Sequence, residues 1–166
     1  MDASPLLTRI AELLERHGLE AVLIGNSAAA LHGAPVTTID LDFLFPKSPA
    51  NLKRLKAIAA ELEAVILRPY YPVSGLFRIC RDRDGLQLDF MTLIDGIRSF
   101  EGLRKRAIAV RLGDASLPVA SLADIIKSKK ATGRLQDMAV LRLLEKTLEE
   151  APPDPKSPAR SSQERK

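Results

Sequence analysis

The chain has 166 residues, of which 46% are hydrophobic and only 4% aromatic, enough for one domain with a mainly aliphatic core. Its net charge of +4 and pI near 9.4 are mildly basic, which fits a phosphate-rich partner or simply a solvated basic surface. No apolar run approaches the roughly 18 residues that cross a membrane, and the first residues lack a signal-peptide pattern.

Cysteine usage bears on the compartment and on metal binding. The single Cys80 excludes an internal disulfide and suits a reducing environment. One cysteine and two histidines also argue against a structural zinc site. We therefore expect a cytoplasmic protein without membrane association.

Apolar periodicity and turn residues predict the order of elements along the chain. The expected helices and strands are helix 6–16, strand 19–24, helix 26–32, strand 39–45, helix 49–63, strands 64–67, 76–81, 86–93, 106–112 and 116–119, and helices 121–132 and 135–149. Asp82-Arg83-Asp84-Gly85 predicts one hairpin and Gly113-Asp114 a second. Ser121 is the expected N-cap of the helix that ends before Gly133.

This order predicts an α+β fold of one mixed β-sheet with helices packed against it and two C-terminal helices. It is not a doubly wound dinucleotide-binding fold, because no Gly-x-Gly-x-x-Gly follows the first strand and no phosphate-binding Gly-x-x-x-x-Gly-Lys-Ser/Thr occurs. Residues 1–150 are expected to form a single domain. Residues 151–166 are rich in Pro, Ser and charge, and we expect a disordered tail.

Two aspartates, Asp40 and Asp42, lie two positions apart in a predicted strand. Side chains at that spacing point to the same face of a sheet. Mg²⁺ prefers such hard oxygen ligands, and usually takes one or two carboxylates plus phosphate oxygens and water. The pair therefore predicts a metal site, while a solvent-facing pair at a strand end is the alternative.

A glycine-led turn, Gly25-Asn26-Ser27, precedes this strand. Gly25 lets the backbone turn tightly and approach a ligand. Ser27 and the first amide groups of the following helix could bind a phosphate, or the segment could be an ordinary strand-to-helix turn with Ser as a cap.

A third carboxylate, Asp89, interrupts the apolar strand Leu86 to Leu93. A buried charge is costly unless it is paired or bound to a metal. If this strand lies beside the one that carries Asp40 and Asp42, three carboxylates meet, as in two-metal phosphoryl transfer. The alternative is that Gln87 and Asp89 face water.

These residues together resemble the nucleotidyltransferase superfamily, in which a Gly-Ser or Gly-Gly-x turn precedes Asp-x-Asp and a later third Asp. More narrowly, the stretches Gly25 to Gly33, Thr38 to Phe43 and Asp124 to Asp137 are similar to the small bacterial nucleotidyltransferases related to AbiEii-type toxins of abortive-infection systems. The similarity covers about residues 19 to 145. Asn26 stands where relatives often have Gly, and Val36-Thr37-Thr38 replaces their Arg-x-Thr.

The resemblance implies roles for individual residues. Asp40, Asp42 and Asp89 would be the catalytic carboxylates and the ligands of Mg²⁺ or Mn²⁺, with Asp89 either completing the metal site or acting as base toward the acceptor hydroxyl. The nucleotide-binding residues would be Gly25, Asn26, Ser27, Lys129, Arg134 and Asp137. Lys127 and Lys130 are rivals of Lys129, and a solvated helix face is the alternative for all three lysines.

The function that follows is metal-dependent transfer of a nucleoside monophosphate from an NTP to an acceptor, which could be RNA, a protein or a small molecule. The toxin-like resemblance implies tRNA or protein as the acceptor and a separate antitoxin as partner. A degenerate, non-catalytic binding module on the same fold, serving as antitoxin or nucleotide sensor, is the main alternative. A basic RNA-binding adaptor is a third, and would bind RNA in a salt-dependent way.

Overall fold

The computed structural model describes residues 4–37 and 40–152 of the chain. Ile39 of the expected strand 39–45, its neighbour Thr38 and most of the expected tail lie outside these residues. The elements in chain order are α1 (Ser4–His17), β1 (Val22–Ile24), α2 (Gly25–Leu31), β2 (Leu41–Leu44), α3 (Pro49–Glu61), β3 (Val65–Leu67), β4 (Phe77–Arg81), β5 (Leu86–Met91), α4 (Phe100–Arg106), β6 (Ile108–Leu112), β7 (Ala115–Val119), α5 (Leu122–Thr132) and α6 (Leu135–Glu150).

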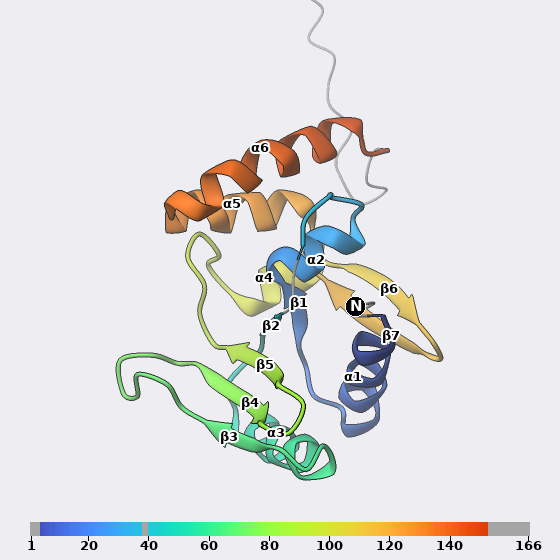
Figure 1. The fold of residues 1–166 in the computed structure, drawn as a ribbon, viewed down its shortest axis with the longest axis vertical. Helices are drawn as coiled ribbons and strands as arrows, with labels where there is room; N and C mark the ends of the chain where they lie inside the picture. The colour runs from blue at the N-terminus through green and yellow to red at the C-terminus, as the bar shows by residue number, and fades with distance from the viewer. Residues whose placement is uncertain (1–3, 38–39, 153–166) are drawn as a thin grey trace, which may run out of the picture.

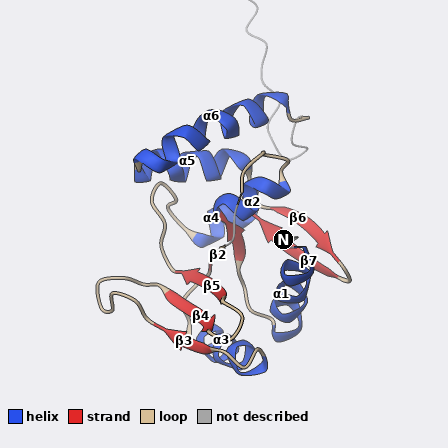
Figure 2. Cartoon of the chain, viewed as in Figure 1, coloured by secondary structure: helices blue, strands red, loops and turns tan. Residues whose placement is uncertain are grey.

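All described strands join one seven-stranded sheet in the order β3-β4-β5-β2-β1-β7-β6, with helices around it (Figure 2). β2 pairs in parallel with β5, and β1 in parallel with β7, while the other four pairings are antiparallel. The fold is therefore α+β with a mixed sheet, as the sequence predicted.

A row of apolar side chains crosses the sheet at one level. Leu23 in β1 is opposite Phe43 in β2, Phe43 is opposite Phe90 in β5, and Phe90 is opposite Phe77 in β4. The rings of Phe43 and Phe90 stack with their centroids 4.9 Å apart. Because successive side chains in a strand point to opposite faces, the next residue of each strand leaves this core for the other face.

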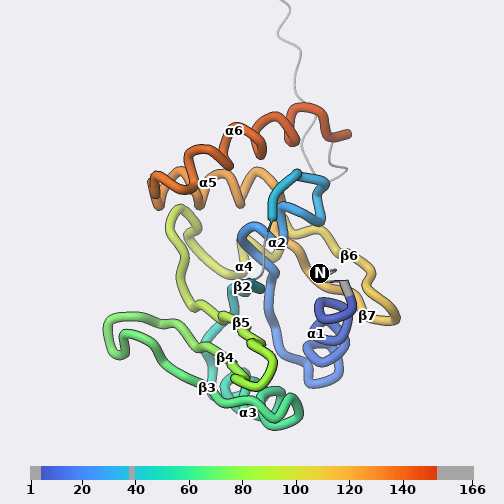
Figure 3. Tube along the Cα trace, viewed as in Figure 1, coloured from blue at the N-terminus to red at the C-terminus, as the bar shows by residue number. Residues whose placement is uncertain are grey.

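Helices pack along the sheet and against one another. α1 packs on β6 and β7 and also contacts α3, which packs on β3. α2 contacts β1, β2 and α5, and α5 lies beside α6. In Figures 1 and 3, α5 and α6 occupy one end of the molecule, while β3, β4 and α3 occupy the other. None of the helices among the described residues has the length and apolar character needed to cross a bilayer.

Helix α4 is absent from the sequence prediction. Its seven residues include a glycine, and so short an apolar pattern is weak. The helix is capped by Ser99, whose hydroxyl accepts a hydrogen bond from the Gly102 amide at 3.0 Å, and it is fixed by Leu103, which is buried. Tertiary packing thus stabilises a helix that the local apolar periodicity does not predict.

Candidate active site

The turn at Gly25 brings the backbone against Asp42. Gly25 has φ +70°, and a Cβ atom there would lie 3.0 Å from Asp42 Oδ2. A side chain would therefore need a left-handed backbone and would also press on the carboxylate. Glycine at this position keeps the Asp42 carboxylate in its place.

Ser27 ties the turn to the first aspartate. Its hydroxyl is buried and donates a hydrogen bond of 2.7 Å to the backbone carbonyl of Asp40. Its neighbour Asn26 has a buried side-chain oxygen that accepts no hydrogen bond from the described residues. Ser27 thus positions Asp40, and the predicted contact of Ser27 with a phosphate stays a prediction.

A second row of paired residues, three of them charged, crosses the sheet beside the apolar one. Ile24 in β1 is opposite Asp42 in β2, Asp42 is opposite Asp89 in β5, and Asp89 is opposite Arg78 in β4. Residues paired in this way point to the same face. The parallel pairing of β2 with β5 therefore puts Asp42 and Asp89 side by side, as the sequence required for a shared site.

The charge of Asp42 is poorly compensated. The pKa of its carboxyl rises from 3.8 to about 6, mainly because burial disfavours the charged form, and further because the charges of Asp89 and Asp40 repel it. Lys129 and Arg78 oppose this rise. The carboxylates of Asp40, Asp42 and Asp89 thus interact electrostatically at one place, although Asp40 is exposed and Asp89 is buried.

Asp89 has a cationic partner that the sequence analysis missed. Arg78 Nε donates to Asp89 Oδ1 at 2.8 Å and Nη2 donates to Oδ2 at 3.0 Å. The Asp-Gly hairpin signal could have found this pair, because a four-residue connection between positions 81 and 86 places residue 78 opposite residue 89.

A cavity of about 290 Å³ opens beside the glycine turn. It is lined by Gly25, Asp124, Ser128, Lys129, Arg134 and Asp137, among others. The predicted nucleotide-binding residues of α5 and α6 therefore share one hollow with Gly25. Lys127 is exposed, and Lys130 pairs with Glu145 at 2.6 Å.

Ion pairs order the charged groups of this cavity. Lys129 Nζ lies 3.1 Å from Asp137 Oδ1, and both side chains are largely buried. Asp124 Oδ2 accepts hydrogen bonds from Arg106 Nε at 2.8 Å and from the Ser121 hydroxyl at 3.0 Å. Arg134 is exposed at the same cavity. Lys129 also lies close enough to Asp42 for its positive charge to lower the pKa of that carboxyl.

His32 ends α2 and has a structural contact. Its Nε2 lies 2.7 Å from the carbonyl oxygen of Ala120, which follows β7. This hydrogen bond anchors the helix after the glycine turn to the neighbouring strand, in line with the expectation that His32 marks a helix end.

Solved structures with a similar fold are nucleotidyltransferases. The antibiotic-resistance factor ANT(2'')-Ia covers 89% of the chain and 86% of its own length with a TM-score of 0.62 at 14% identity. The lincosamide antibiotic adenylyltransferase LnuA, solved with lincomycin, covers 85% and 95% with a TM-score of 0.62 at 13% identity. A nucleotidyltransferase-like protein from Paracoccidioides brasiliensis covers 91% and 77% with a TM-score of 0.59 at 12% identity.

The chain therefore has the fold of the nucleotidyltransferase superfamily, as the motif pattern predicted. No protein-family model matches the sequence, and no curated protein is similar to it in sequence.

Proposed function

We propose that the chain is a metal-dependent nucleotidyltransferase that moves a nucleoside monophosphate from an NTP to an acceptor and releases pyrophosphate. The observation that carries this proposal is the register of β2 with β5, which sets Asp42 beside Asp89. The backbone at Gly25 lies against the Asp42 carboxylate at the same place. The similar folds of ANT(2'')-Ia, LnuA and the fungal protein support the same class of reaction.

The donor set fits a divalent metal at Asp40 and Asp42. The pKa of Asp42 is raised mainly by burial and further by the negative charges of Asp89 and Asp40, and a bound Mg²⁺ or Mn²⁺ would relieve the repulsion among these carboxylates. The described residues contain no group of three His, Cys, Asp or Glu side chains arranged to hold a metal, so phosphate oxygens and water would complete the coordination. Bound there, the metal would neutralise charge on the transferring phosphate.

The nucleotide would lie in the cavity beside Gly25. Lys129 and Arg134 supply positive charge to this hollow. Asn26, which follows Gly25 in the chain, has a side-chain oxygen that accepts no hydrogen bond from the described residues. Asp137 would hold Lys129 in place through their 3.1 Å ion pair. In this proposal the triphosphate would lie between the aspartate pair and α5.

The acceptor would carry a hydroxyl group, on RNA such as tRNA, on a protein or on a small molecule. ANT(2'')-Ia has been solved with adenylyl-2''-tobramycin and LnuA with lincomycin, so these antibiotics belong among the acceptors to test. A toxin role further predicts that the chain arrests growth through Asp42, and that a separate antitoxin protein relieves the arrest.

The test is release of pyrophosphate by the full chain from each of the four NTPs. Each reaction contains Mg²⁺ or Mn²⁺ and one acceptor: tRNA, total RNA, a protein extract, tobramycin or lincomycin. We expect α-labelled nucleotide in one acceptor class, lost in Asp42→Asn and retained in Asp84→Asn, a matched change at an exposed hairpin turn. Nucleotide binding without pyrophosphate release in any reaction would refute the enzyme and identify the binding module instead.

A further inference from the structure

The two edge strands of the sheet differ in their side chains. In β6 the exposed positions hold Ala109 and Arg111, and a charge on an edge strand opposes pairing with another chain. In β3 the residues Val65, Ile66 and Leu67 carry no charge, and no described strand pairs with their outer side. An uncharged and unpaired edge strand is a template for a further strand. The β3 edge is therefore the open end of the sheet.

Large apolar side chains gather at this edge and in the loop that follows it. Val65 and Leu67 are 59% and 49% exposed, and Tyr70, Tyr71 and Val73 are 64% to 93% exposed. Side chains of this size and exposure offer on the order of 600 Å² of surface per copy. A standard interface buries about 800 Å² per partner, so this patch with the backbone of β3 approaches what a stable dimer needs.

The two faces of β3 have different surroundings. Ala64, Ile66 and Arg68 line an apolar groove of about 430 Å³ between β3 and α3, so Val65 and Leu67 point to the other face. The side chain of Arg68 also holds the loop against the strand. Its guanidinium carbon lies 4.3 Å from the ring centroid of Tyr71 and 4.2 Å from that of Phe77.

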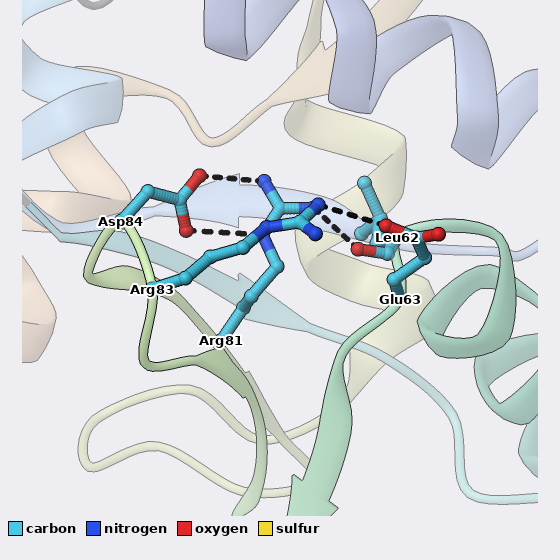
Figure 4. Close-up of polar contacts among 5 residues, drawn as sticks. All are labelled: Leu62, Glu63, Arg81, Arg83 and Asp84. Atoms are coloured by element: carbon cyan, nitrogen blue, oxygen red, sulfur yellow. Dashed lines mark hydrogen bonds and ion pairs between the residues drawn. The ribbon is translucent and has the colours of Figure 1, made fainter.

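Polar contacts with the β4–β5 turn restrain the entry to β3 (Figure 4). Arg83 Nη2 lies 2.8 Å from Glu63 Oε2, and Arg81 donates to the carbonyl of Leu62. Arg81 Nε and Nη2 also donate to the carboxylate of Asp84 at 3.0 and 2.7 Å. A restrained edge loses less conformational freedom when it pairs with another strand.

We propose that β3 pairs antiparallel with β3 of a second copy of this chain, about a two-fold axis at Ile66, so that two sheets become one. In this register Ile66 faces its own counterpart, and Val65 faces Leu67 of the other copy. An axis at Val65 would set Leu67 against Glu63, and an axis at Leu67 would set Val65 against Pro69. Only the axis at Ile66 sets apolar side chains opposite one another at all three positions of the strand.

The charges at the ends of the paired strands are also complementary. With the axis at Ile66, Arg68 lies opposite Ala64 of the other copy, which follows the end of α3 at Glu61. The C-terminal end of a helix carries partial negative charge, which attracts a cation. The Nε atom of Arg68 is buried and donates to no described residue. Because a single strand supplies both halves of every contact, a second copy fits this edge, and two-fold dimers are the commonest assemblies.

The interface and the proposed function are independent of each other. Figure 1 places β3, β4 and α3 at one end of the molecule, and α5 and α6 at the other. The cavity beside Gly25 is lined by residues of α5 and α6, so pairing at β3 leaves it open in both copies.

The first test measures the mass of the full chain in solution by sedimentation velocity, from about 1 to 100 µM. We expect wild type to form a dimer within this range. Leu67→Lys sets two charges into the paired strands and should raise the dissociation constant of the dimer about tenfold or more. Leu135→Lys is the matched control at a leucine of α6 that is 91% exposed, and it should leave the dissociation constant unchanged.

Wild type that stays monomeric at about 100 µM would overturn the inference, and so would equal weakening of the dimer by Leu67→Lys and Leu135→Lys. Circular dichroism first establishes that each variant is folded. If Leu67→Lys does not fold, Val65→Lys takes its place, because it sets a charge opposite Leu67 of the other copy.

The second test determines the register by disulfide formation with oxidised glutathione. Cys80→Ser removes the only native cysteine, and Ile66→Cys is then added. Directly opposite residues of antiparallel strands have Cα atoms about 4.5–5.5 Å apart, within the range of a disulfide. We therefore expect a band of doubled mass on a non-reducing gel, which a reductant removes.

Val65→Cys in the same Cys80→Ser background is the control for register. With the axis at Ile66, the two copies of residue 65 are diagonal neighbours about 7–8 Å apart, so cross-linking should be about tenfold slower or more. Faster cross-linking of Val65→Cys than of Ile66→Cys would overturn the proposed axis. A dimeric protein in which Ile66→Cys does not cross-link would show that the copies meet elsewhere and would overturn the inference.

Discussion

Replacing Asp42 by Asn should stabilise the metal-free protein at neutral pH. The carboxyl of Asp42 has a pKa raised from 3.8 to about 6, so the folded state holds a proton there that the unfolded state releases. Stability from this group is present at low pH and is lost as pH rises from about 4 to about 6. Asn resembles the neutral acid and does not titrate, so its contribution to the free energy of unfolding stays constant over the same pH range.

The size of the effect follows from the shift. A rise of about two units corresponds to about 3 kcal/mol, and partial exposure of Asp42 to solvent reduces this to about 1–3 kcal/mol at pH 7.5. At pH 4 the difference between Asp42→Asn and wild type should be smaller by this amount. The free energy of unfolding is measured by urea titration in chelator at both pH values.

Asp84 is the control with the opposite sign. Its pKa is lowered to about 2, mainly by the hydrogen bond from Arg81, so its contribution is present above pH 4 and is lost toward pH 2. Asp84→Asn should therefore not gain stability between pH 4 and 7.5. An Asp42→Asn variant whose advantage over wild type does not grow with pH would refute the uncompensated charge on which the metal site depends.

Three further variants, and Gly33→Ala as the control for the first, test the site and the core. Gly25→Ala should destabilise the fold by about 1–2 kcal/mol through its left-handed backbone and should weaken Mn²⁺ binding through Asp42. Gly33 has φ +88° and open space where a Cβ atom would lie, so Gly33→Ala should lower the free energy of unfolding in urea without weakening Mn²⁺ binding. Equal losses of Mn²⁺ binding in the two glycine variants would contradict the contact between residue 25 and Asp42. Lys129→Met removes a charge that lowers the pKa of Asp42, so the pKa measured by NMR titration should rise, and an unchanged value would exclude their proximity. Phe90→Ala should cost about 3–5 kcal/mol in urea unfolding, as for other buried aromatic residues, and a loss below 1 kcal/mol would contradict its place in the core.

Much of the fold followed from local patterns. The Asp-Gly turn predicts the β4–β5 hairpin, and Ser121 caps α5 by accepting from the Asp124 amide at 3.2 Å. The same turn specifies the partner of Asp89, which the sequence analysis nevertheless missed. α4 could not be predicted in this way, because a seven-residue helix depends on burial of Leu103 more than on its own periodicity.

For the candidate site, the sequence alone determined which side of each strand is polar. Apolar residues must leave water, and side chains alternate along a strand, so burying Phe43 and Phe90 turns Asp42 and Asp89 to the opposite face. Only the tertiary structure decided that these two faces meet at the same level. The parallel pairing of β2 with β5 joins strands far apart in the chain, and no local turn encodes its register, because packing of the whole sheet selects it.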